Sequence, residues 1–252
     1  MITPATATEQ MSANALILAL EASGDAVSVA VLQNDVCRAF KQHQARFGHA
    51  EHLVGLVREA LADAGADISA ITHIAAGCGP GSFTGLRVCL SAAKGYALAT
   101  TAQPVGVNGL AALAVNTYSA ASPDPDMSPA LLGPIICFAD TRRQSVFVQI
   151  FDAEARAQTS VADIPFDQLS SWLSDVVERS EGLTVRLSGI TDQLAVHISD
   201  HAGLIASPQP VDAAMIARYA ALSLAAPDDY PHTGFSPLYV VAPKLGPAKH
   251  QT

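Results

Sequence analysis

The order of secondary-structure elements predicted for the first half of the chain returns in the second half. This repetition limits the possible folds more than any single motif does. Both halves begin with two apolar stretches joined by a tight turn, at 15–32 and at 134–152. Stretches of this kind are typical of strands in a hairpin. A helix, a strand and a further helix follow in each half. The halves share no visible sequence identity, so the predicted repetition is one of topology.

Apolar runs and period-two alternation predict strands at 15–20, 26–32, 36–42, 71–77, 103–107, 134–140, 145–152, 155–163, 185–190, 203–207 and 235–241. Apolar residues at helical spacing predict helices at 49–65, 86–100, 108–118, 165–180 and 211–226. Two such units in tandem predict an α/β fold with two actin-like (ASKHA, ribonuclease H-like) domains, each built on a mixed central sheet.

The predicted domain boundaries follow from composition. We expect a disordered extension at 1–14, within which Met11 is a candidate start, and an N-terminal domain at 15–118. Four prolines among small polar residues predict a linker at 119–134. The C-terminal domain is predicted at 135–252, and the end of the chain is a candidate to pack back on the N-terminal domain.

The charge and the cysteines limit the function classes. The formal net charge is −9, which argues against direct wrapping of nucleic acid because phosphate contacts need a basic surface. The four cysteines contain no CxxC pair, which predicts free thiols in a reducing compartment. Neither a secretory signal nor a long apolar run is visible, so we expect a cytoplasmic protein without a membrane span.

The segment "GCGPGSFTG" at 77–85 joins a predicted strand to an alanine-rich helix, as phosphate-binding loops do. It matches neither the Walker motif nor the nucleophile elbow nor the dinucleotide fingerprint. Two interpretations stay open: a structural turn capped by Ser82 or Thr84, or a site for an anion or a partner. The candidate residues of this signature loop are Gly79, Pro80, Gly81, Ser82, Phe83, Thr84, Gly85 and Arg87.

Two other motifs resemble catalytic ones. Ser91 and Lys94 form an SxxK pair, but the partner motifs of serine acylases are missing. His49 and His52 flank Glu51, but a zinc-protease helix needs two histidines four residues apart. We therefore predict ordinary helix residues at both places, and neither a catalytic residue nor a metal ligand.

In actin-like proteins the first hairpin of each half carries an acidic residue that faces ATP and metal. The corresponding positions here are Glu21, followed by Ser23 and Gly24, and Asp140. Neither turn has the glycine-led sequence that lets a backbone approach phosphate closely. These residues predict a degenerate nucleotide site or none. We expect Arg87 to clamp an anion, to pair with Glu21 or Asp140, or to be an exposed cation.

The chain resembles the TsaB (YeaZ) family, a paralogue of TsaD in the synthesis of threonylcarbamoyl-adenosine in tRNA. The stretch "GPGSFTGLRVCLSAAKGYALA" is similar to the family's "GPGSFTGxRIGxxxAxGLA". The segments "LALEASGDAVSVAV", "GHAEHL", "VGVNGLAALA", "CFADTRRQSVFVQIF" and "SPLYVVAP" resemble further family motifs. Residues 153–235 add little to the resemblance. The chain departs from the family at Glu21 (aspartate), at Cys89 (glycine) and in "YVVAP", which lacks an arginine.

The resemblance implies a non-catalytic scaffold subunit. It would activate a TsaD-like partner that transfers the threonylcarbamoyl group to adenosine 37 of ANN-decoding tRNAs. It implies a homodimer or a heterodimer with the TsaD-like subunit, a TsaE-like ATPase, and contact with tRNA only through the partner. No cofactor would be bound tightly, and ATP or ADP would sit at the interface with the TsaD-like partner. The alternatives are a glycoprotease-type peptidase and an actin-like nucleotide-binding enzyme.

The resemblance also implies that the N-terminal domain at 15–118 carries dimerisation and that its two long helices, at 51–64 and 86–100, form the partner interface. A charged residue at Ala93 or Ala97 is then expected to abolish pairing and leave the fold intact. The expected interface residues are Leu53, Leu56, Val57, Ala60, Val88, Ala92, Ala93, Tyr96 and Ala97.

Overall fold

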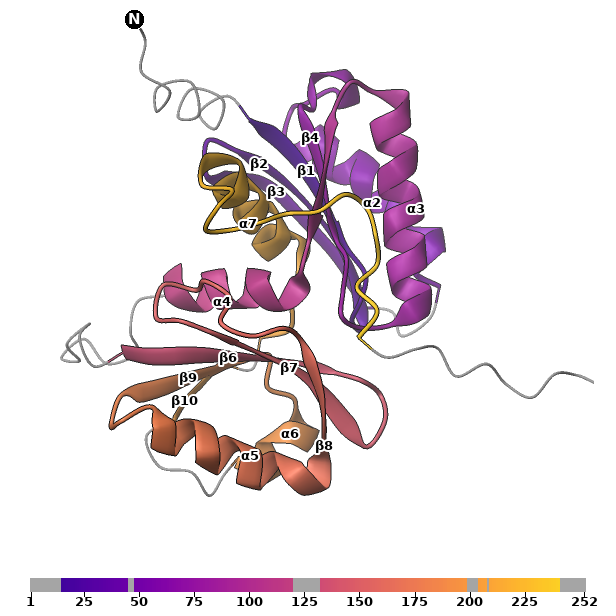
Figure 1. The fold of residues 1–252 in the computed structure, drawn as a ribbon. Coiled ribbons are helices and arrows are strands. Elements are labelled where there is room, and N and C mark those ends of the chain that lie inside the picture. The colour runs from indigo at the N-terminus through magenta and orange to yellow at the C-terminus, as the bar shows by residue number, and fades with distance from the viewer. Residues whose placement is uncertain (1–14, 45–47, 120–131, 199–203, 208, 241–252) are drawn as a thin grey trace, which may run out of the picture.

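The computed structural model describes residues 15–44, 48–119, 132–198, 204–207 and 209–240 (Figure 1). The predicted extension at 1–14, most of the predicted linker and the chain end beyond 240 lie outside the described residues. The described residues form two lobes, each with a five-stranded sheet.

The first sheet has the strand order β3-β2-β1-β4-β5. Its strands β1, β2 and β3 pair antiparallel, and β4 and β5 join β1 in parallel. Alternation and apolar runs specify these strands, and every residue of β1 after its first is buried. The strands are β1 (Leu16–Glu21), β2 (Ala26–Gln33), β3 (Val36–Gln44), β4 (His73–Gly77) and β5 (Gln103–Val107).

The second sheet repeats this topology. Its order is β10-β9-β6-β7-β8, with β6, β7 and β8 antiparallel and β9 and β10 parallel to β6. The predicted repetition and the predicted mixed sheets are therefore confirmed. The strands are β6 (Leu132–Asp140), β7 (Ser145–Phe151), β8 (Ala162–Pro165), β9 (Thr184–Ser188) and β10 (Leu204–Ser207).

Two pairs of helices cover the outer faces of the sheets. On the first sheet these are α2 (His49–Asp63) and α3 (Phe83–Ala99), with a short 3₁₀ turn η1 (Ile68–Ala70) before β4. On the second sheet they are α5 (Phe166–Arg179) and α6 (Asp192–Ile198), which lie on one side in Figure 1. The sequence analysis missed α6, a helix of only seven residues.

The two remaining helices are exchanged between the lobes. Helix α4 (Gly109–Ser119) follows the first sheet in sequence but packs on β6, β7 and β9 of the second. Helix α7 (Ala213–Ala225) follows the second sheet but packs on β1, β2, β4 and β5 of the first. The predicted domain boundaries at 118 and 135 therefore do not divide the chain into the two lobes, because one helix of each half packs on the sheet of the other half. Helices α4 and α7 contact each other, and one core cluster spans both sheets through them.

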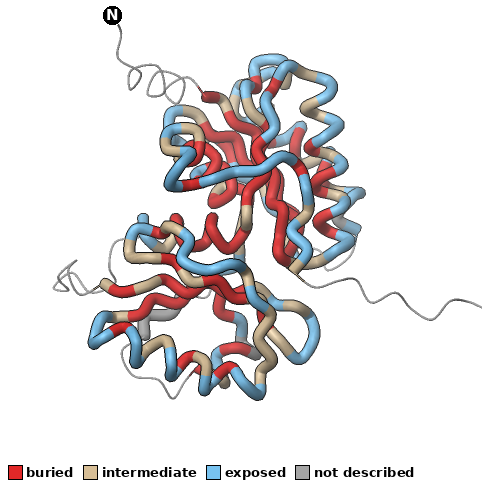
Figure 2. The backbone as a smooth tube through the Cα atoms, in the orientation of Figure 1, coloured by how far each residue is buried: buried red, intermediate tan, exposed pale blue. Residues whose placement is uncertain are grey.

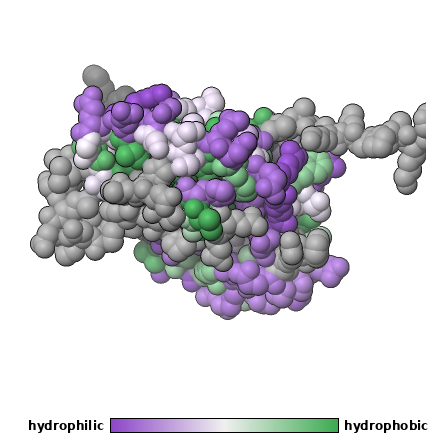
Figure 3. All heavy atoms as spheres, turned by 90° about the horizontal axis from the view of Figure 1, so that it is seen from below, coloured by the Kyte–Doolittle hydropathy of each residue, from purple (hydrophilic) through white to green (hydrophobic). Residues whose placement is uncertain are grey.

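The buried residues follow the strands of both sheets, as Figure 2 shows. Helix α4 is buried from Gly109 to Val115, because the second sheet lies on one side of it and α7 on the other. In the view of Figure 3, from below the orientation of Figure 1, the hydrophobic residues form separate spots among hydrophilic ones. None of the helices in the described part of the chain is long and apolar enough to cross a membrane.

One predicted boundary and two predicted strands are wrong. Strand β6 begins at Leu132, inside the segment predicted as linker, because the sheet accommodates Pro134 at a register shift. The strand predicted at 155–163 is replaced by a turn and the short β8. The described part of the strand predicted at 235–241 is not a strand and pairs with none.

The tail, residues 226–240 after α7, crosses the first lobe. Thr233 and Gly106 exchange backbone hydrogen bonds, and Leu238 donates its N–H to the carbonyl of Cys78 at 2.8 Å. A Cβ at Gly106 would lie 2.3 Å from the carbonyl oxygen of Gly234, so only glycine allows this approach. The tail therefore covers the edge strand β5.

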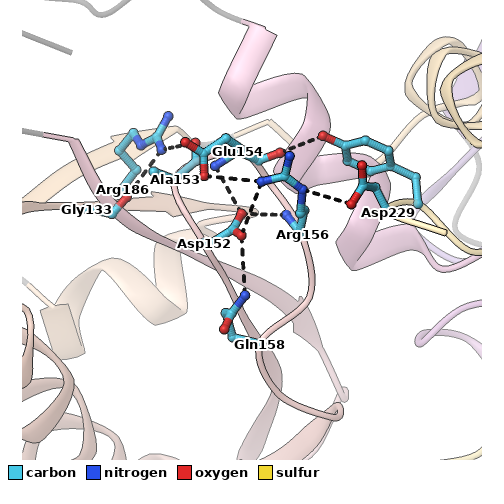
Figure 4. A network of polar contacts seen from close by, with 9 residues as sticks. Gly133, Asp152, Ala153, Glu154, Arg156, Gln158, Arg186 and Asp229 are labelled. Carbon is cyan, nitrogen blue, oxygen red and sulfur yellow. Dashed lines mark hydrogen bonds and ion pairs between the residues drawn. The ribbon is translucent and has the colours of Figure 1, made fainter. Parts of the chain in front are cut away.

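Polar contacts join the lobes on the side of the tail. Arg156, in the loop after β7, forms an ion pair with Asp229 at 3.2 Å (Figure 4). The hydroxyl of Tyr230 donates to the carbonyl of Glu154 at 2.9 Å. Asn108 donates to the side chain of Gln149 at 2.7 Å. These contacts fix the tail and the start of α4 to the second lobe.

Candidate functional site

The signature loop is a compact turn between β4 and α3, held by backbone hydrogen bonds to neighbouring segments of the chain. Cys78 donates its N–H to Val107 at 2.7 Å, and Gly79 accepts from the N–H of Gly109 at 2.8 Å. The N–H of Ser82 donates to the carbonyl of Ser23 at 2.8 Å. The amides of Cys78 and Ser82 therefore bind other segments of the chain and are not free to cradle a phosphate.

Gly81 brings the loop against the turn between β1 and β2. Its φ is +157°, and a Cβ there would lie 2.7 Å from both the Cβ and the carbonyl oxygen of Ser23. Any other residue would push the two segments apart. The requirement for glycine at this position is therefore one of packing between two chain segments.

Ser82 caps α3, which begins at Phe83 and not at Leu86. Its Oγ accepts the N–H of Gly85 at 3.3 Å, whereas Thr84 lies exposed in the first turn. Of the two capping residues left open by the sequence, the structure selects Ser82. Gly85 is a buried helix residue.

We expect Ser82→Ala to lower the free energy of unfolding by about 1 kcal/mol, since it removes a helix cap. Urea unfolding followed by circular dichroism measures this loss. The control is Ser91→Ala, an exposed position of the same helix, where we expect a change within about 0.5 kcal/mol. Equal effects of the two variants would contradict a capping role.

Arg87 does not reach either acidic hairpin position. Its guanidinium lies over the ring of Phe83, 4.0 Å from the ring centre. The ring of Tyr239 in the tail lies 5.9 Å from that of Phe83. The expected pairing of Arg87 with Glu21 or Asp140 is therefore wrong. The first turns of α3 instead hold the tail through aromatic contacts.

Glu21 is buried, with 2% of its surface exposed. Its Oε1 accepts the N–H of Ser23, and its Oε2 has no hydrogen-bond partner. A Cβ at Gly77 would overlap this oxygen, so glycine on the neighbouring strand makes room for the carboxyl group. Burial raises the pKa of Glu21, which favours its neutral form. Glu21 is therefore enclosed by the chain itself, and its carboxyl group contacts the turn that follows it.

The other predicted nucleotide-site residues line a cavity between the lobes. Ser23 and Gly24 lie on the first lobe and Asp140 on the second, around a volume of about 390 Å³. Asp140 accepts the N–H of Arg142 at 2.7 Å and so shapes its own turn. The structure thus brings three of the four predicted positions together, while Glu21 is absent from the lining.

The four cysteines described are free, and three of them are buried. Burial raises the pKa of Cys78 to about 11 and that of Cys89 well above the usual thiol range. Thiols with such pKa values are protonated at neutral pH and are poor nucleophiles.

The histidine and serine motifs do not form catalytic or metal-binding groups in the described part of the chain. The ring of His52 stacks on that of His43 with 3.8 Å between ring centres. Within the described part of the chain, no group of three or more His, Cys, Asp or Glu residues is arranged to hold a metal. Ser91 and Lys94 lie exposed on α3.

The predicted partner interface is only partly on the surface. Leu53, Val57, Ala60 and Ala93 are buried against the first sheet, so these four assignments are wrong. Apolar residues at helical spacing mark the face of a helix that turns toward its own core. The partly buried members of the predicted interface are Leu56, Val88, Ala92, Tyr96 and Ala97.

The outward faces of α2 and α3 carry apolar residues that the sequence analysis missed. Val54 is 63% exposed and Leu98 is 87% exposed. Gly55 and Gly95 lie beside them, and a Cβ at either glycine would meet nothing within 4 Å. Both glycines occupy helix interiors, where glycine costs about 0.5–1 kcal/mol relative to alanine. No contact within the chain requires them.

Two mixed sheets of equal strand order, with exchanged helices around a central cavity, define a two-lobed protein of the actin-like class. A family model described as "TsaD: tRNA N6-adenosine threonylcarbamoyltransferase" matches residues 41–186, which is more than half of the chain. The chain belongs to this family, as a relative of TsaB (YeaZ).

Curated relatives match through part of the chain. The tRNA threonylcarbamoyladenosine biosynthesis protein TsaB of Haemophilus influenzae is 35% identical over 104 residues, which cover 40% of this chain and 42% of that protein. TsaB of Escherichia coli is 33% identical over 40% of this chain and 44% of that protein. The tRNA N6-adenosine threonylcarbamoyltransferase of Streptococcus pneumoniae is 38% identical over 38% of this chain and 33% of that protein. The matches span less than half the length of these relatives.

A solved structure shares the fold over most of the chain. YeaZ from Pseudomonas aeruginosa superposes with a TM-score of 0.70 and 23% identity, and the match covers 89% of this chain and 99% of that one. It shows that both lobes have the same arrangement as in that protein.

Proposed function

We propose that this chain is a non-catalytic partner subunit in the threonylcarbamoylation of tRNA adenosine, and that a TsaD-like subunit carries out the transfer. The proposal is supported by membership in the family and by relatives named in threonylcarbamoyladenosine biosynthesis. The observation that carries the partner role is the outward face of α2 and α3. It combines exposed apolar residues with interior glycines over open space.

The geometry of this face suits a second helix pair. Small residues let helices approach closely, and an exposed leucine beside a glycine supplies apolar area to bury. Gly55 and Gly95 are unfavourable within the isolated chain, and close contact with a partner would compensate for them. The same face can accept a TsaD-like subunit or a second copy of this chain, as the resemblance implies.

The chemistry of the buried groups supports a role without catalysis. Glu21 is buried and does not line the cavity, and burial raises the pKa of the Cys78 thiol to about 11, so this thiol is protonated at neutral pH. We propose that the chain binds no cofactor tightly and that ATP or ADP sits at the interface with the TsaD-like partner. A TsaE-like ATPase would join this complex in the cytoplasm. The net charge of −9 favours contact with tRNA through the partner.

Copurification tests the partner role. The tagged chain, co-expressed with a TsaD-like protein, should retain that protein at a stoichiometric level. Supplied with an activated threonylcarbamoyl donor and the TsaE-like ATPase, the pair should form modified tRNA that neither protein forms alone. Turnover of a peptide or of ATP by this chain alone would contradict the proposal and favour the peptidase or the nucleotide-binding enzyme.

Gly95→Leu is expected to weaken this pairing at least tenfold, since it fills the space through which a partner helix approaches. We expect the free chain to be at least as stable as before, because leucine favours a helix more than glycine does. Analytical ultracentrifugation measures pairing, and urea unfolding measures stability. Ser171→Leu on α5 of the second lobe is the matched control. Unchanged pairing of Gly95→Leu would place the interface elsewhere.

A further inference from the structure

Two exposed aromatic rings and an arginine lie together where the tail reaches the first turns of α3. Phe83 is 42% exposed and Tyr239 is 54% exposed. The centres of these two rings lie 5.9 Å apart, and their planes form an angle of 38°. The guanidinium of Arg87 lies over the Phe83 ring, 4.0 Å from its centre, and Arg87 is itself exposed. Phe83, Arg87 and Tyr239 are called the aromatic patch below.

Backbone contacts hold both sides of the aromatic patch in place. Leu238 donates its N–H to the carbonyl of Cys78 at 2.8 Å, which fixes the tail one residue before Tyr239. Ser82 caps α3 one residue before Phe83. An aromatic ring on such a fixed backbone loses little conformational entropy when a ligand covers it. The aromatic patch is therefore a preorganised surface.

The segments that carry the aromatic patch have a charge opposite in sign to the net charge of −9. Residues 68–123, which include α3, contain Arg87 and Lys94 and neither Asp nor Glu. Residues 230–252, which include the end of the tail, contain two lysines and no acidic residue. Among the described residues, Arg87 forms no ion pair. This distribution favours an anionic ligand at the aromatic patch.

Aromatic rings beside a cation fit one class of anionic ligand best. Phenylalanine, tyrosine and arginine are also common in protein interfaces, but an apolar protein surface gains nothing from the local positive charge. Unpaired RNA offers both complements, since its bases stack on aromatic rings and its phosphates contact arginine. In a duplex the base faces are covered by neighbouring base pairs, so the same surface would not stack on it.

We infer that the aromatic patch binds single-stranded RNA, with one unpaired base stacked on Tyr239 and the neighbouring phosphate bound by Arg87. The choice of RNA rests on the proposed function, in which the partner modifies tRNA. A contact with one base and one phosphate is local, so it is compatible with a net charge that opposes wrapping of nucleic acid. The TsaD-like partner would still supply most of the RNA contacts.

The test is binding of the full chain, without a TsaD-like protein, to a fluorescein-labelled single-stranded RNA of about ten nucleotides. Fluorescence anisotropy at low ionic strength measures the affinity. Tyr239→Ala should weaken binding about tenfold, as expected for the loss of one stacked base. Tyr239→Phe should bind like the wild type, because the ring and not the hydroxyl group makes the contact. Both positions of change are exposed, and circular dichroism checks that the variants fold.

Arg87 and the duplex form of the RNA test the two halves of the contact separately. Arg87→Gln should weaken binding and reduce the slope of its salt dependence by about one. The wild type should bind the duplex at least about tenfold more weakly than the single strand, since stacking is lost.

Two variants control for a general loss of aromatic surface or of positive charge. Tyr118→Ala removes an exposed ring from α4, and Arg38→Gln removes an exposed cation from β3 at the far edge of the first sheet. Both variants should retain the wild-type affinity for the single-stranded RNA. An equal loss in either control would overturn the inference.

Other results would overturn it as well. These are no binding by the wild type, unchanged affinity of Tyr239→Ala, and equal affinity for the single strand and the duplex. If Tyr239→Ala lost copurification with the TsaD-like protein but kept its RNA affinity, the aromatic patch would be a protein interface and the inference would be wrong. The RNA titration uses the chain alone, so its result is independent of whether the wild type pairs with a TsaD-like protein.

Discussion

Ala93→Glu is expected to prevent folding, whereas Leu98→Glu is expected to leave the fold intact and to abolish pairing. Ala93 has no exposed surface and packs in the core cluster between α3 and the first sheet. A carboxylate there would lose its hydration without gaining a partner, at a cost of several kcal/mol. Natural domains are stable by only about 5–15 kcal/mol. Five residues later on the same helix, Leu98 is 87% exposed.

The two variants are compared by circular dichroism, by urea unfolding and by copurification with the TsaD-like protein. The free energy of unfolding of Leu98→Glu should lie within about 0.5 kcal/mol of that of the wild type. In copurification this variant should retain less than a tenth of the partner that the wild type retains. Leu183→Glu, which changes an exposed leucine of the second lobe, is the control for lost apolar surface. If Leu98→Glu paired normally, this face of α3 would not be the interface. A folded Ala93→Glu would contradict the packing of α3.

The repeated topology could be predicted because it depends on local patterns. Apolar or alternating stretches of four to nine residues between turn signals specify the strands, and the same strand order appears in both sheets. The exchange of α4 and α7 could not be predicted, since periodicity shows that a helix is buried but not against which sheet. Helix α4 is apolar on nearly all sides, and that pattern is compatible with either lobe.

The candidate site, too, could be predicted only where a local rule applies. Ser82 as a cap follows from a local rule, and the structure confirms it. The partner face was expected from the family resemblance, and four of its residues turn inward because a helix buries its apolar stripe. Arg142 and Asp25 form an ion pair although they lie 117 positions apart, and such a pair has no local signal. The burial of Glu21 depends on Gly77 in the parallel neighbour strand, a contact that only the sheet register creates.

Glu21→Gln is expected to remove part of the pH dependence of stability. Burial raises the pKa of Glu21 in the folded chain above the ordinary value of 4.5. Between these two pKa values the folded state holds a proton that the unfolded state has released. The contribution of Glu21 to stability is therefore fully present below about pH 4.5 and falls as the pH rises toward the folded-state pKa. The slope reaches at most about −1.4 kcal/mol per pH unit for one proton.

Urea unfolding at several pH values between 5 and 8 measures this slope. The glutamine side chain keeps the shape of the acid and titrates nowhere in this range, so the difference between the two slopes isolates Glu21. The amide group of the variant would lack a partner where Oε2 lacks one now, which costs stability equally at every pH and leaves the slope unaffected. Glu59→Gln, at an exposed position of α2, should leave the slope unchanged.

Identical slopes for the wild type and Glu21→Gln would mean that Glu21 is ionised in the folded chain. A charged carboxylate beneath the signature loop would need a partner, and the assignment of this loop as a purely structural turn would then be wrong.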